Sequence, residues 1–209
     1  MDKPARYSCH SLHLPGGTLP DDKAWASLPS LQLVDVVTGE SPFLSTQCQL
    51  ARDDARQLLF VRFQGEDDEI HSSFRLLDEP LYRQDVFELF LCEDGDLTRY
   101  KELECSPWDV HFDGLVHFPQ GGRPKLDVDW DIEGWTSQTV YDAQQHRITS
   151  LWALPYAAFS RPPKAGESWR MGVFRIDHSR RGQSLQAWQA TGQPNFHVPE
   201  RFGYLDFKA

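Results

Sequence analysis

Three glutamates in the middle of the chain could perform acid–base chemistry or accept a polar ligand. They are Glu88, Glu102 and Glu104. Two strand-like runs, Asp85–Cys92 and Arg99–Ser106, carry them, and the acidic segment around Gly95 is typical of a hairpin turn. A turn centred there places Glu88 about opposite Glu102. Because side chains alternate between the two faces of a strand, the three carboxylates share one face, and the other face is apolar.

Like charges on one face of a sheet repel, so this pattern requires a compensating group. We expect Arg175, inside the apolar run Met171–Ile176, to supply the positive charge, with solvent or a polar ligand as the alternatives. Two interpretations remain open. Either the face accepts a ligand, or the glutamates and an arginine form an internal network that ties the sheet to a loop.

Glycoside hydrolysis is one reaction that paired carboxylates can catalyse. The strand rise places Glu102 and Glu104 about 6.6 Å apart, inside the range of about 6.5–9.5 Å that inverting enzymes use. Such a pair must flank the scissile bond from opposite sides, whereas neighbours on one strand project in parallel. The arrangement therefore disfavours catalysis by this pair.

The tail of the chain, Trp188–Phe207, is a second concentration of aromatic and polar groups. Prolines and glycines divide it, and neither a strand nor a helix period holds between Thr191 and Arg201. This predicted loop carries Phe196 and His197 and then enters a short apolar strand. A loop so composed, held by a closing strand, is suited to presenting side chains.

Short β-type runs separated by turn signals fill most of the chain. We predict strands over 31–37, 46–51, 57–64, 85–92, 99–106, 110–115, 136–142, 147–154, 168–176, 185–190 and 204–207. Only 155–160 and 21–28 have a helical pattern. The order predicts an all-β protein, a distorted antiparallel β-sandwich of the jelly-roll or immunoglobulin-like kind. No repeat or long linker divides it, so we expect one sandwich domain over 25–209, with residues 1–24 as an arm packed on it.

The charge balance restricts the possible partners. The chain has 21 Lys and Arg against 31 Asp and Glu, a net charge of −10. This disfavours nucleic acid and anionic membranes as partners, because both require clustered basic residues. The first twenty residues lack the apolar core of a signal peptide, so we expect a cytoplasmic location for the sequence as written, with export open if a leader was trimmed. The sequence does not indicate an oligomeric state.

The cysteines and histidines do not indicate a metal site. The four cysteines have no C-x-x-C spacing, and those in strand-like runs are expected to be reduced and packed. His111, Asp113 and His117 are close in sequence, but surface histidines explain them more simply. We therefore expect no cofactor from the residues themselves.

Four motifs in order carry a resemblance to a known family. They are Glu79–Phe90, Tyr100–Pro107, Trp169-Arg170 with Arg175, and Asn195–Phe207. With them the chain resembles the family-nine carbohydrate-binding modules and their stand-alone bacterial relatives, from about Trp25 to Phe207. The resemblance implies a distorted β-sandwich and non-catalytic sugar recognition, in which two facing tryptophans clamp a terminal sugar and polar side chains surround its hydroxyls.

The motifs also imply which positions form the site. One clamp position falls at Tyr82 and the other at Phe196, so both tryptophans are replaced. The amide that bonds the sugar falls near Gln193, and a basic position falls near Glu104, where the charge is inverted. Trp108, directly after the second motif strand, could restore a large aromatic platform or could simply pack its own loop.

The resemblance also makes structural calcium possible, because members of the family can bind it. Asp127, Asp129, Asp131 and Glu133 alternate along one segment, but Ile132 and Gln138 stand where an EF-hand loop needs Gly and Glu. An acidic, solvated edge is the preferred interpretation of this segment.

Three hypotheses therefore remain. The first is a non-catalytic module that holds a mono- or oligosaccharide end, with aromatic platforms and polar contacts supplied by Tyr82, Trp108, Phe196, Glu102, Glu104, Arg175 and Gln193. The second is a glycoside hydrolase or sugar-modifying enzyme that uses the Glu88, Glu102 and Glu104 cluster. The third is an interaction module without a small-molecule site.

Overall fold

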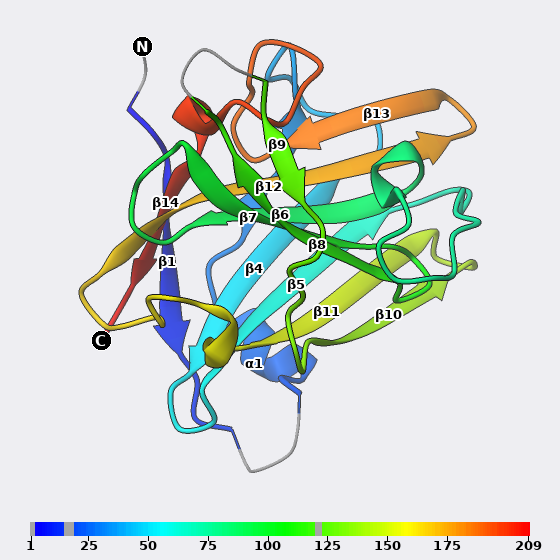
Figure 1. Cartoon of the computed structure of the whole chain (residues 1–209). Coiled ribbons are helices and arrows are strands. Elements are labelled where there is room, and N and C mark those ends of the chain that lie inside the picture. Colours follow the sequence, from blue (N-terminus) through cyan, green and yellow to red (C-terminus); the bar gives the residue numbers. More distant parts are fainter. Residues whose placement is uncertain (1–2, 15–18, 120–122) are drawn as a thin grey trace.

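Two β-sheets face each other in the computed structural model, which describes residues 3–14, 19–119 and 123–209 (Figure 1). The first sheet contains β3 (Val34–Asp35), β6 (Val86–Cys92), β7 (Arg99–Cys105), β8 (His111–His117), β9 (Lys125–Asp127), β12 (Ser168–Ser179), β13 (Gly182–Ala187) and β14 (Gly203–Phe207). The second contains β2 (Leu31–Gln32), β4 (Thr46–Asp53), β5 (Leu58–Glu66), β10 (Thr136–Asp142) and β11 (Arg147–Pro155). Strand β1 (Arg6–Ser11) pairs with β14 of the first sheet and β4 of the second. The helices are short: α1 (Asp22–Ala26), η1 (Leu81–Arg83), η2 (Tyr156–Ala158) and η3 (Pro199–Arg201).

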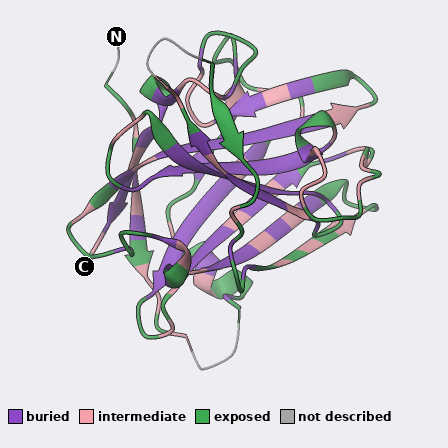
Figure 2. Ribbon diagram, in the orientation of Figure 1, coloured by how far each residue is buried: buried purple, intermediate pink, exposed green. Residues whose placement is uncertain are grey.

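The main core lies between the sheets. Alternation along each strand sends one set of apolar side chains inward, and Phe63 of β5 stacks on Phe87 of β6 with ring centroids 4.8 Å apart. Trp152 of β11 packs against Phe63 at 5.1 Å. Figure 2 shows the buried residues running along the central strands of both layers. The all-β sandwich predicted from the sequence is confirmed.

Strand β1 differs from the expectation for the N-terminal segment. Residues 1–24 are predicted as an arm, yet Arg6–Ser11 joins the two sheets. Both of its pairings are parallel, so the sandwich is mixed and not purely antiparallel. The partner strand β14 lies about 200 residues further along the chain. No local turn signal in the sequence could therefore predict this pairing.

Two further expectations can be compared with the structure. Cys48, Cys92 and Cys105 are free and buried, as predicted for the cysteines in strand-like runs, and Cys9 is free and buried as well. Among the described residues, no helix has the length and apolar character needed to cross a membrane.

A buried ion network lies at one edge of the core and is centred on Arg175 of β12. Its Nη2 donates to Asp67 Oδ2 at 2.9 Å and to Asp177 Oδ1 at 2.6 Å. Its Nη1 donates to the carbonyl of Glu66 at 2.8 Å and to Thr46 Oγ1 at 2.9 Å. All of these groups lie between the sheets, so the guanidinium ties β12 to β4 and β5.

The network predicts a large stability cost for removing the arginine. Arg175→Met leaves the carboxylates of Asp67 and Asp177 buried without their cation, and we expect a loss of about 3–5 kcal/mol in the free energy of unfolding. Urea unfolding at neutral pH measures it. Arg99→Met is the matched control, because Arg99 is 63% exposed where it pairs with Asp94 and Asp96, and such pairs contribute about 1 kcal/mol or less. Equal losses in the two variants would contradict the assignment.

Candidate functional site

The hairpin of β6 and β7 sets the positions of the three glutamates. Glu88 pairs directly with Glu104, and Phe90 pairs with Glu102. The predicted pairing of Glu88 with Glu102 is therefore wrong by two residues. The turn is longer than expected, because Asp96 accepts hydrogen bonds from the backbone and hydroxyl of Thr98 and so keeps these residues out of the strands. A slip of two residues leaves every side chain on its predicted face.

The three glutamates gather on the outer face of this sheet, away from the main core. Exposure is 1% for Glu88, 3% for Glu102 and 0% for Glu104. One carboxylate oxygen of each lies within 4.8 Å of the other two. Glu88 Oε1, Glu102 Oε2 and both oxygens of Glu104 have no hydrogen-bond partner. We call this group the carboxylate trio.

Arg175 does not compensate the carboxylate trio, contrary to the sequence-based expectation. It pairs across the sheet with Phe87, whose side chain enters the main core, whereas the neighbouring Phe174 pairs with Glu88. Alternation therefore sends the guanidinium to the opposite face of the sheet from the trio. There it binds Asp67 and Asp177.

Burial makes the carboxylate trio hard to ionise. It raises the pKa of Glu102 to about 7. The pKa of Glu88 is raised well above its usual range by burial first and then by the charge of Glu102. Burial and the charges of both neighbours raise the pKa of Glu104 in the same direction. Burial therefore favours the protonated, neutral forms of these carboxyls over their ionised forms.

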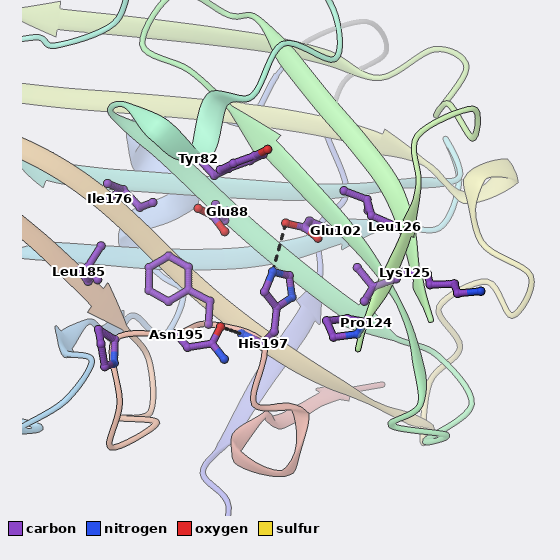
Figure 3. A pocket seen from close by; sticks show the side chains of 13 residues that line it. Tyr82, Glu88, Glu102, Pro124, Lys125, Leu126, Ile176, Leu185, Asn195 and His197 are labelled. Carbon is purple, nitrogen blue, oxygen red and sulfur yellow. Dashed lines mark hydrogen bonds and ion pairs between the residues drawn. The ribbon is translucent and has the colours of Figure 1, made fainter. Parts of the chain in front are cut away.

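Glu88 and Glu102 form the floor of a cavity of about 430 Å³, and Glu104 lies beneath them. Figure 3 shows Glu88 and Glu102 between Tyr82 on one side and Asn195 and His197 on the other. The cavity extends across the outer face of the first sheet from β13 to β9. Its lining residues are Tyr82, Glu88, Glu102, Val116, Pro124, Lys125, Leu126, Ile176, Leu185, Pro194, Asn195, Phe196 and His197.

The tail loop closes one side of the cavity and is fixed by His197. The Tyr100 hydroxyl and His197 Nδ1 share a hydrogen bond of 2.7 Å, and the imidazole stacks on Phe90 with centroids 5.2 Å apart. Burial lowers the pKa of His197, which favours the neutral ring. Its Nε2 lies 4.0 Å from Glu102 Oε1, facing the floor.

Aromatic rings line two sides of the cavity. Tyr82, in η1, is 43% exposed and packs edge-on against Phe112 at 6.1 Å. Phe196, in the tail loop, is 7% exposed and stacks on Phe174 with centroids 4.5 Å apart. Tyr82 is thus the accessible ring, and Phe196 offers a smaller surface.

The structure brings together some of the predicted site residues and separates others. Tyr82, Glu102 and Phe196 line the cavity, and Glu104 lies beneath its floor. Arg175 lies on the opposite face of the sheet, as described above. Trp108 is outside the cavity, where its indole donates to the carbonyl of Ser72 at 2.9 Å.

The amide position also differs from the expectation. Gln193 is exposed and does not line the cavity, whereas Asn195, two residues further, does. Asn195 Oδ1 accepts the backbone N–H of His197 at 3.0 Å, which turns the loop inward. The sequence reasoning missed Asn195 because the loop has no period from which its orientation can be derived. It also missed the apolar walls formed by Val116, Leu126, Ile176 and Leu185.

A second hollow, of about 660 Å³, lies on the other side of β9. Its buried charges are already satisfied, because Lys101 forms an ion pair with Glu93. Glu93 also accepts hydrogen bonds from the Ser160 hydroxyl at 2.9 Å and the Arg161 backbone at 2.8 Å. The smaller cavity is the better candidate because its polar floor is unpaired.

Among the residues that the structure describes, two groups of carboxylates are close enough to share a cation, namely the trio and the group of Asp78, Asp113 and Asp131. Asp113 already accepts the backbone N–H of Ile132 at 2.5 Å. The residues weighed as a calcium segment, Asp127, Asp129, Asp131 and Glu133, are all exposed. His111 is not arranged as a ligand, because its Nε2 bonds to Ser137 Oγ and its ring stacks on Trp135 at 4.0 Å.

The trio predicts an unusual dependence of stability on pH. The folded state holds protons on these groups at pH values where the unfolded chain, with a glutamate pKa of about 4.3, has released them. The contribution of the trio to the free energy of unfolding is therefore largest at low pH. It falls as the pH rises above about 4.3 and through the raised pKa values of the folded state. Glu104→Gln cannot ionise, so we expect its slope of unfolding free energy between about pH 5 and pH 8 to be shallower by up to about 1.4 kcal/mol per pH unit.

Urea unfolding across this pH range measures the slope. Glu40→Gln removes an exposed carboxyl outside the cavity and serves as the matched control, whose slope should equal that of the unchanged protein. Parallel slopes for Glu104→Gln and the unchanged protein would show that Glu104 ionises normally.

No protein-family model matches the sequence, and no curated protein matches it either. Solved structures of similar fold exist. A candidate carbohydrate-binding protein from Bacteroides uniformis superposes with a TM-score of 0.77 at 15% identity, over 99% of this chain and 100% of its own. A family-nine carbohydrate-binding module from Caldicellulosiruptor kristjanssonii in complex with cellotriose has a TM-score of 0.62 at 16% identity, over 98% and 94%. The structure of a family-nine module from the same organism in complex with glucose has the same TM-score and identity, over 98% and 96%. The fold of this chain is therefore that of the family-nine carbohydrate-binding modules, as the resemblance in its motifs implies.

Proposed function

We propose that the cavity binds a carbohydrate without catalysis, as a monosaccharide or the end of an oligosaccharide. The observation that carries the proposal is an open cavity in which an accessible tyrosine stands over unpaired, buried carboxyls. Its volume lies within the range of about 300–1,000 Å³ typical of small-molecule sites. The same fold holds cellotriose and glucose in the family-nine modules described above, which supports this choice of ligand.

The chemistry of the lining suits a sugar ring. The C–H face of a sugar can lie on the face of Tyr82, and Phe196 and Leu185 provide further apolar surface. Carboxyl, amide and imidazole groups of Glu102, Asn195 and His197 can exchange hydrogen bonds with hydroxyls. Each contact contributes only about 0.5–1.5 kcal/mol, against an association cost of about 4 kcal/mol or more. We therefore expect affinities in the micromolar to millimolar range.

The geometry does not favour the hydrolase hypothesis. The strand-rise estimate places Glu102 and Glu104 about 6.6 Å apart, but one carboxylate oxygen of each member of the trio lies within 4.8 Å of the other two. Inverting enzymes need about 6.5–9.5 Å between their carboxyls. All three also approach from one floor, so no pair flanks a glycosidic bond. An interaction module without a small-molecule site would have this space filled and closed by Glu–Arg pairs, whereas no arginine among the described residues lines the cavity.

Removing the accessible ring should weaken sugar binding. Tyr82→Ala deletes the exposed aromatic wall while leaving the strands intact, and we expect a 2- to 12-fold increase in Kd, about 0.5–1.5 kcal/mol. Titration calorimetry against a panel of mono- and disaccharides measures it. The matched control is Phe43→Ala, which removes an exposed ring that lies outside the cavity.

Two outcomes would contradict the proposal. One is the absence of heat with any sugar at tens of millimolar in folded protein. The other is a loss of binding in Trp108→Ala with none in Tyr82→Ala, which would place the site at the surface near Ser72 instead of in the cavity.

A further inference from the structure

The floor of the cavity has an excess of acid that a neutral sugar does not require. Three carboxyl groups stand together there, and four of their oxygens have no hydrogen-bond partner. The basic side chain that lines the cavity, Lys125, is exposed on β9 and points away from the glutamates (Figure 3). His197 faces Glu102 but is neutral. Within the described ranges, no cation contacts the trio.

We propose that the sugar bound in this cavity is an amino sugar, whose positively charged amino group is received by the carboxylate trio. The inference rests on the proposed function and names its ligand class. The apolar and aromatic walls pack against the sugar ring, and the acidic floor binds the ammonium group.

The geometry of the floor matches an ammonium group. An ammonium has three N–H donors and no acceptor. The trio offers one oxygen from each of three carboxyls, and these oxygens lie within 4.8 Å of one another, close enough for one ammonium group to bond to all three. Glu88 and Glu102 line the cavity and meet the amino group first, while Glu104 lies directly behind them.

A neutral hydroxyl is a weaker partner than the amino group at this position. It has one donor where an ammonium has three, and it carries no charge to balance ionised carboxylates. A protonated amine bonds to three carboxyl oxygens and also balances the charge, so neighbouring carboxylates can ionise together. We expect a preference of about 10- to 100-fold for an amino sugar over its neutral parent.

Binding of an ammonium group should release protons. Burial keeps the empty trio at least partly protonated at neutral pH, and the incoming cation favours the ionised carboxylates. Affinity should therefore rise with pH until the ligand loses its own proton. The other titratable groups around the cavity are Tyr82, Tyr100, Lys125, His197 and the more distant Glu200. His197 is already neutral and Lys125 points outward, so neither opposes this trend.

Titration calorimetry with matched sugars tests the proposal. Glucosamine, galactosamine and mannosamine are compared with glucose, galactose, mannose and the three N-acetylated forms, which keep the ring and remove the charge. We expect tighter binding of at least one amino sugar by about 10- to 100-fold than of its neutral counterparts. The heat should change with the ionisation enthalpy of the buffer, as proton release requires. Equal affinity for the neutral sugars overturns the inference and leaves the proposed function standing, whereas no binding of any sugar overturns both.

Substitutions of the glutamates in the cavity floor test whether these residues cause the preference for amino sugars. In Glu102→Gln and Glu88→Gln the ratio of affinities for amino and neutral sugar should fall at least 5- to 10-fold, because one acceptor becomes an amide donor. Glu40→Gln, an exposed glutamate outside the cavity, should keep the ratio of the unchanged protein. Repeating the titrations with calcium chloride and with EDTA tests whether a metal ion, and not an ammonium group, occupies the trio. A preference that vanishes in EDTA, together with calcium binding that Glu102→Gln abolishes, would overturn the inference and make the trio a metal site.

Discussion

The register of the β6–β7 hairpin places Glu88 directly opposite Glu104 on a sheet face that is otherwise largely apolar. Like charges in that position repel, and burial adds to the cost of ionising them. Two conditions relieve the repulsion, protonation or the arrival of a cation. The character of the candidate site follows from this constraint, because the tail loop and η1 surround the carboxylate trio and leave a cavity above it.

The buried charges on the two faces of the first sheet differ in whether they have a partner of opposite charge. On the inner face, Arg175 binds Asp67 and Asp177, so a buried cation is matched by carboxylates and by backbone acceptors. On the outer face, three carboxyls stand without a basic partner at the bottom of an open space. The network on the inner face holds the sandwich together. Since a folded chain gains nothing from an unmatched acidic cluster, the outer group is explained better by a ligand than by stability.

Much of this arrangement is predictable from the sequence, and the failures have physical causes. Period-2 runs identify the long strands and the shared face of the glutamates, since alternation is a local property. The register depends on turn length, which the Asp96–Thr98 hydrogen bonds increase. The orientation of Arg175 could have been predicted by the same alternation argument, because Arg175 lies on the same face of its strand as Val173, which points into the core. Pairing of β1 with β14 and the inward turn of Asn195 depend on distant contacts, which no local pattern encodes.

The central claim is that the trio holds protons when the cavity is empty and gives them up to a cation. The most direct measurement is the carboxyl ¹³C chemical shift of Glu88, Glu102 and Glu104 in NMR spectra followed across pH, with signals assigned from single Glu→Gln variants. The account predicts that at least one of these carboxyls remains protonated above about pH 6, where an ordinary glutamate with a pKa of about 4.3 is ionised. It also predicts that adding glucosamine at constant pH moves that signal to the carboxylate position. Ionisation of all three groups below about pH 5 in the empty protein would contradict it.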